Sequence, residues 1–374
     1  MSKPMRAIIE AALGVAILVG CATTPPPGRP ASLGEARAPA WSLEMADNQL
    51  IIAVSPTRRT MQLAGSYGTV IGASISAVAN DRYKQRLYGA LGEGYDLVPV
   101  ITQRLSERLD AAIDAPLERV DPMTSTAGYH TRRDARTARC EGLAKQGFDS
   151  VLDLKAKCGV FGPEGTLVVT LGGDLRLLPE DIQLWANHIF VADTPVLASD
   201  KLTDPTKNLT PDFSMRLKAD KDAISQWTRD DGATLRQAIE DGVDAAVSAV
   251  LCDLGLAQEA VGEYRLGRLA IASKEFKKAD NHLRKAHELD PECPRIRNAM
   301  AVNAAYDGRV DEAIRKAKAI TESNPDFAPP WFNLAWWHAI DREDLDAAKS
   351  FYERALKLGL GRNDKLDKKL GLGE

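Results

Sequence analysis

The sequence predicts an α+β domain, with helices packed on a mixed sheet, followed by an all-α solenoid of about three helix pairs. Two observations predict this fold class: apolar residues alternate with a period of two in the middle of the chain, and like residues recur thirty-four positions apart in its last third. The 374 residues leave room for about two domains. A net charge of -4 provides no basic field of the kind that binds nucleic acid.

Residues 1–21 have the pattern of a signal peptide, with two basic residues before a mostly apolar stretch. The stretch ends in Leu18-Val19-Gly20-Cys21, which resembles the lipobox of bacterial lipoproteins. This resemblance implies that Cys21 carries the lipid, such as palmitate, that anchors the chain. Because Ala22 rather than an acidic residue follows, it also implies the outer membrane, facing the periplasm. An ordinary secretory signal and a poor transmembrane anchor are the alternatives.

Residues 22–46 are predicted to form a tether, because their proline-rich composition favours extended chain over a packed core. Residues 47–255 are predicted to form the α+β domain. We expect its elements in this order: a buried strand at 50–54, helices at 68–91 and 97–113, a short helix at 134–144, strands at 151–158, 166–178 and 185–191, an edge strand near 213–217, and a closing helix at 235–254. Gly172-Gly173 predicts a bulge within the second of the alternating strands.

This element order is similar to that of TolB-type amino-terminal regions, curli-secretion lipoproteins and the lipoprotein activators of penicillin-binding proteins. The resemblance implies work by contact with other envelope components rather than by catalysis. Outside the cytoplasm a disulfide is possible, and Cys140 with Cys158 is the pair we expect, since a helix and the next strand could bring them together. Buried free thiols are the alternative for both, as for Cys252 and Cys293.

Residues 257–361 contain the repeat. The corresponding residues are Leu266, Met300 and Leu334; Gly267, Ala301 and Ala335; Ala279 and Ala313; Pro291 and Pro325. This period and order resemble the tetratricopeptide repeat, a pair of antiparallel helices. The third unit is shifted by one residue in its second half, which predicts one extra residue in its turn at 341–345. Residues 362–374 are predicted to form a tail or a polar capping turn.

The resemblance to this repeat implies an inner groove that binds a protein partner, either an extended peptide or a helix. The implied groove residues are Tyr264, Arg268, Arg295, Asn298, Tyr306, Phe332 and Trp336. Their aromatic and basic character suits a partner with an acidic end. The clamp that some family members use for a terminal carboxylate is missing. Alternatively the groove is filled by the chain itself, or Trp336 and Trp337 are simply packed.

Chemistry-bearing motifs are missing from the sequence, which contains neither a phosphate-binding loop nor a nucleophile elbow nor a His-Glu-x-x-His helix. We therefore expect no catalytic residue, no metal and no cofactor. The sequence predicts a lipid-anchored, non-catalytic envelope adaptor that holds a protein partner in its repeat groove. The alternative is an oligomeric subunit of a secretion or transport assembly in the outer membrane.

Overall fold

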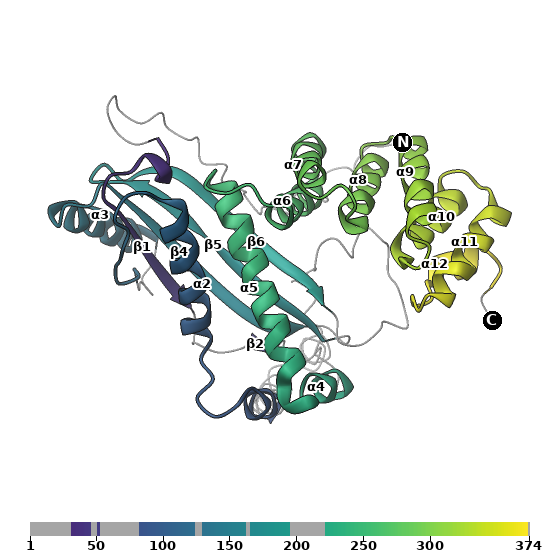
Figure 1. Cartoon of the computed structure of the whole chain (residues 1–374), viewed down its shortest axis with the longest axis horizontal. Coiled ribbons are helices and arrows are strands. Elements are labelled where there is room, and N and C mark those ends of the chain that lie inside the picture. The colour runs from purple at the N-terminus through teal and green to yellow at the C-terminus, as the bar shows by residue number, and fades with distance from the viewer. Residues whose placement is uncertain are drawn as a thin grey trace, which may run out of the picture.

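The computed structural model describes residues 31–45, 51–52, 82–123, 129–161, 165–194 and 221–372. These residues form a mixed sheet with helices on both faces, followed by a run of antiparallel helix pairs (Figure 1). The fold class therefore agrees with the prediction. Cys21, most of the helix expected at 68–91 and the edge strand expected near 213–217 lie outside the described residues, and helix is seen at 82–91.

The sheet has the order β3-β1-β4-β5-β6, with β2 beside β4. Its strands are β1 (Pro39–Met45), β2 (Ile51–Ile52), β3 (Glu118–Arg119), β4 (Ser150–Phe161), β5 (Thr166–Leu177) and β6 (Ile182–Thr194). Strands β1 and β2 run parallel to β4, whereas β4, β5 and β6 form an antiparallel meander. The three predicted alternating strands are confirmed. Strands β4 and β6 extend beyond both of their predicted ends, and β5 ends one residue before its predicted end.

Strand β1 corrects the predicted tether, because Pro39–Met45 belongs to the sheet and not to a linker ending at residue 46. A short 3-10 helix, Leu33–Glu35, precedes it, and Leu33 is fully buried. Both faces of β1 are covered, so its residues show no alternation that a sequence pattern could reveal. Pro39 is tolerated since it is the first residue of the strand.

Helices α2 (Leu97–Ala112) and α5 (Ala233–Asp253) cover one face of the sheet, and α3 (Tyr129–Lys145) covers the other. Asp96 caps α2 as predicted, and its side chain accepts a hydrogen bond from the Val98 backbone N–H. Two short segments, α4 (Lys221–Trp227) and a 3-10 turn at Asp230–Gly232, lead into α5. The helices predicted at 97–113, 134–144 and 235–254 are confirmed, with α3 starting five residues earlier.

The glycine pair in β5 does not form the predicted bulge, because its pairing with β4 is regular at both positions. A Cβ on Gly173 would overlap the Asp153 carbonyl oxygen. One on Gly172 would lie 2.7 Å from the Asn187 carbonyl oxygen. Glycine is required here by the close approach of neighbouring strands.

Three helix pairs and a short final helix make up the solenoid. They are α6 (Ala260–Ala272) with α7 (Phe276–Leu289), α8 (Pro294–Tyr306) with α9 (Val310–Ser323), α10 (Ala328–Ile340) with α11 (Leu345–Lys357), and α12 (Asp364–Lys369). The turns inside the first two pairs have three residues, and the third turn, Asp341–Asp344, has four. The predicted extra residue is therefore confirmed. Helix α12 forms the predicted capping turn, and its Leu366 is fully buried against the last repeat.

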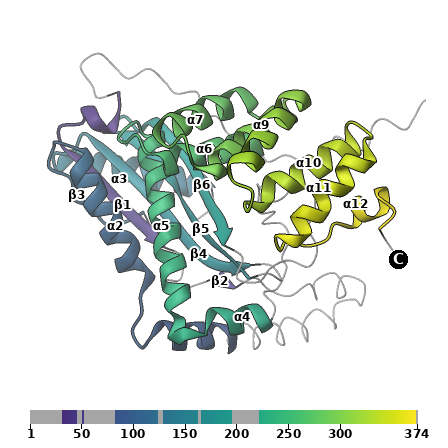
Figure 2. The same cartoon turned by 45° about the vertical axis from the view of Figure 1, so that its right-hand side comes forward.

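The sheet domain caps the other end of the solenoid, since α6 packs on α5 and β6 (Figure 2). Leu266 of α6 is part of the hydrophobic core of the sheet domain. Gly262 permits this crossing, because a Cβ there would lie 2.6 Å from the Ser248 carbonyl oxygen of α5. Glu259, just before α6, is bound by Arg108 of α2 and by the Ser248 hydroxyl. In the described part of the chain, no helix combines the length and apolarity needed to cross a membrane.

Candidate protein-binding groove

The first helix of each repeat contributes to one layer, in which α8 lies between α6 and α10. Val261, Tyr264 and Arg268 are spaced three and four residues apart, so they share one face of α6. The corresponding positions of α8 include Arg295 and Asn298. These are the faces of α6 and α8 at which the sequence predicts the inner surface of the groove.

The α6 end of this surface is basic and aromatic. The guanidinium carbons of Arg265 and Arg268 lie 5.3 and 5.7 Å from the centre of the Tyr264 ring, within the range of cation–π attraction. Tyr264 and Arg268 are half-buried, and Arg295 at the start of α8 is exposed. Arg265 was not among the predicted groove residues, because its position in the repeat is not one of the family's groove positions.

An amide pair crosses the middle of the surface. Asn333 Nδ2 of α10 donates a hydrogen bond of 2.9 Å to Asn298 Oδ1 of α8. Sequence reasoning predicted Asn298 and missed Asn333. Tyr306, at the end of α8, stacks on Phe276 with ring centres 6.1 Å apart, which fixes the orientation of its phenol.

A pocket of about 180 Å³ opens between α8 and α10. Tyr306, Asn333, Trp336 and Trp337 line it, together with Asp341 at the end of α10. Burial raises the pKa of Asp341 above its ordinary value, whereas nearby Lys365 acts to lower it. The pocket thus combines aromatic faces, one amide and one acidic group.

Two predicted groove residues are largely covered. Phe332 is only 3% exposed and packs between Trp336 and Tyr352, so it belongs to the interior of the third repeat rather than to an open floor. Trp336 is 8% exposed, and Lys365 of α12 lies over its ring, 4.7 Å from the centre. The alternative that the chain itself fills part of the groove therefore holds at the α12 end.

The predicted disulfide is wrong. Cys140 and Cys158 are free thiols that lie in different hydrophobic clusters, because α3 faces one side of the sheet and the Cys158 side chain faces the other. Burial raises the pKa of both thiols to about 12. Each therefore stays protonated at neutral pH and is a poor nucleophile. Cys252 and Cys293 are also free.

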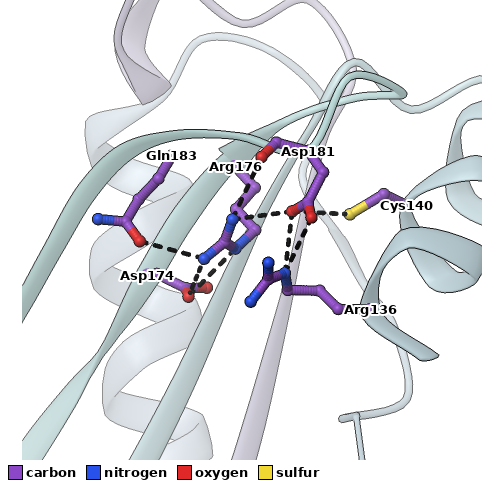
Figure 3. A network of polar contacts seen from close by, with 6 residues as sticks. All are labelled: Arg136, Cys140, Asp174, Arg176, Asp181 and Gln183. Atoms are coloured by element: carbon purple, nitrogen blue, oxygen red, sulfur yellow. Dashed lines mark hydrogen bonds and ion pairs between the residues drawn. The ribbon is translucent and has the colours of Figure 1, made fainter. Parts of the chain in front are cut away.

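The sheet domain also contains a partly buried ionic network (Figure 3). Arg176 donates to Asp174, Gln183 and Asp181, and Asp181 also accepts from Arg136 of α3. Burial alone would lower the pKa of Arg176, but its two carboxylate partners raise it. Arg176 is 7% exposed and permanently charged, and the network attaches α3 to the sheet.

In the repeats, one histidine contacts a buried glutamate of the neighbouring helix. His282 Nδ1 of α7 lies 2.6 Å from Oε2 of Glu263, which is 3% exposed in α6. Among the described residues, no group of three or more histidine, cysteine or acidic side chains is placed to hold a metal ion.

Comparison with known proteins supports the repeat. Residues 264–293 match the family model of the tetratricopeptide repeat. The crystal structure of the Sgt2 TPR domain from Aspergillus fumigatus is similar to 30% of this chain and 75% of that one, with 24% identity and a TM-score of 0.28. No curated protein matches the chain. The C-terminal helices are tetratricopeptide repeats, a module that binds protein partners.

Proposed function

We propose that this chain is a lipid-anchored adaptor of the bacterial cell envelope, which holds a protein partner in its repeat groove and has no catalytic role. The observation that carries the proposal is the inner face of α6, α8 and α10. It offers stacked aromatic and guanidinium groups at one end, an amide pair in the middle and a pocket at the other end. Such a mixed surface suits an extended peptide or a partner helix.

The sequence supports the anchor through the lipobox-like run that ends at Cys21. Two acyl signals suffice for stable attachment to a bilayer without a spanning helix. Cells labelled with an alkyne fatty acid should incorporate it into the wild-type chain but not into Cys21→Ser. Fractionation of the labelled cells should place the wild type in the outer membrane. Equal absence of label from both chains would remove the anchor from the proposal.

Site-directed photo-crosslinking tests the groove. A photoreactive amino acid at Val261, which is 50% exposed on the inner face of α6, should capture a partner protein in cells. The matched control is Leu289, which is 47% exposed at the end of the outer helix α7. Capture from Val261 alone supports the adaptor, and equal capture or none from the two positions contradicts it.

The same experiment distinguishes the alternative function. A subunit of a secretion or transport assembly should crosslink to further copies of itself and migrate as a large, detergent-stable oligomer. An adaptor should be monomeric in detergent and gain mass only with its partner.

A further inference from the structure

The pocket between α8 and α10 is suited to one side chain of a partner. Its volume of about 180 Å³ is below the range of about 300–1,000 Å³ that is typical of whole small-molecule ligands. Its walls include Tyr306, Trp336 and Trp337, and the two tryptophans are 8% and 5% exposed. Such rigid aromatic walls are typical of sites where a single anchor residue is bound.

The charges around this pocket favour a cation. Asp341 is the charged residue among those that line it, and it lies at the C-terminal end of α10, where the helix dipole is negative. Aromatic faces attract ammonium and guanidinium groups for the same electrostatic reason.

Arginines close to the pocket are engaged by carboxylates other than Asp341. Arg309 pairs with Asp307 and Glu312, and Arg342 pairs with Asp311. The positive charges of Arg309 and Arg342 are therefore balanced by these carboxylates and leave the negative charge of Asp341 uncompensated by either arginine.

The chain itself places a cation against one wall residue of this pocket. Lys365 of the short helix α12 holds its ammonium nitrogen 4.7 Å from the centre of the Trp336 ring. Lys365 is exposed, whereas the Trp336 side chain beneath it is almost fully covered. The Trp336 ring therefore already attracts an ammonium group, and the positive charge of Lys365 also acts on Asp341.

We propose that this pocket binds a lysine or arginine side chain of the protein partner, with the cationic head between Asp341 and the aromatic rings. The inference rests on the proposed adaptor function and specifies the chemistry of the partner's anchor residue. It also predicts the orientation of the bound partner: the basic anchor residue lies at the pocket, and an acidic segment lies at the α6 end, near Arg265 and Arg268.

Short peptides and fluorine NMR test this anchor. The full-length chain, labelled with 5-fluorotryptophan and held in detergent, is titrated with acetylated pentapeptide amides that carry a central lysine, arginine, norleucine or glutamate between alanines. The signals of Trp336 and Trp337 are assigned by substitution with phenylalanine. Lysine and arginine peptides should shift these two signals, and the uncharged norleucine peptide should bind at least about fivefold more weakly.

Variants give the reciprocal evidence. Asp341→Asn should weaken binding of the lysine peptide about fivefold, whereas Glu353→Gln, which removes the same charge from the exposed face of α11, should leave it unchanged. Lys365→Met should tighten binding, because it removes a positive charge close to Trp336 and Asp341. Equal binding of norleucine or glutamate, an unchanged Asp341→Asn, or no shift with any peptide would overturn the cationic anchor. The crosslink from Val261 decides the adaptor function separately.

Discussion

Gly262→Ala should loosen the junction between the sheet domain and the repeats. A Cβ at this position would lie 2.5 Å from Cys252 Sγ and 2.6 Å from the Ser248 carbonyl oxygen, both on α5. The carbonyl is held within its helix, so α6 must move away. Overpacking of this kind costs about 1–3 kcal/mol. The better helix propensity of alanine returns about 1 kcal/mol, which leaves a net loss of zero to about 2 kcal/mol.

Gly142→Ala in α3 is the matched control, because a Cβ there meets nothing within 4 Å. This variant should be more stable than the wild type by about 1 kcal/mol, because the better helix propensity of alanine is not offset by a clash. With about 2–4 °C per kcal/mol, the melting temperatures of the two variants should differ by about 2–12 °C, as scanning calorimetry of the full-length chain in detergent can measure. Hydrogen exchange should show the loosening in α6. If Gly262→Ala raises the melting temperature as much as the control does, the close crossing of α5 and α6 is refuted.

Two further predictions concern the sheet domain. Under non-reducing conditions at pH 8, Cys140 and Cys158 should both resist a thiol reagent until the chain is unfolded, because burial keeps their pKa near 12. The less buried Cys293 should react first. Recovery of a disulfide between Cys140 and Cys158 by mass spectrometry would contradict this prediction. Arg176→Met should cost about 1–3 kcal/mol in chemical unfolding, because Asp174 and Asp181 lose their charged hydrogen bonds to it while Asp181 keeps Arg136. Arg284→Met, in an exposed helix pair, should cost less than about 0.5 kcal/mol. Similar costs for the two would contradict the buried network.

The sequence predicted the repeats accurately because their stability depends on local spacing. The small residues Gly267, Ala301 and Ala335 lie thirty-four apart, and each is buried between the helices of its own pair. A Cβ on Gly267 would lie 2.7 Å from Leu283 of α7, which explains why the first unit needs glycine. Each contact of this kind joins residues close in the chain, so the pattern alone reveals it.

Sequence reasoning missed the features that depend on contacts between residues far apart in the chain. Strand β1 pairs with β3 and β4 at its two edges and is covered by helices on both faces, so nothing in Pro39–Met45 alternates. The disulfide was predicted because a helix and the strand after it could bring Cys140 and Cys158 together, but the two side chains lie on opposite sides of the sheet. Asp341 was recognised as part of a turn, and only the packing of α8 against α10 turns it into the charged group of a pocket.

The end of the solenoid and the end of the groove depend on the same residues. The Tyr352 hydroxyl accepts a 2.5 Å hydrogen bond from the Asn363 backbone N–H, and Asn363 in turn caps α12. This capping holds Lys365 over Trp336. A helix of six residues has little stability of its own, so its position depends on these contacts. The contact between Lys365 and Trp336 is one of the interactions that place α12 on the last repeat, beside the cap at Asn363 and the buried Leu366.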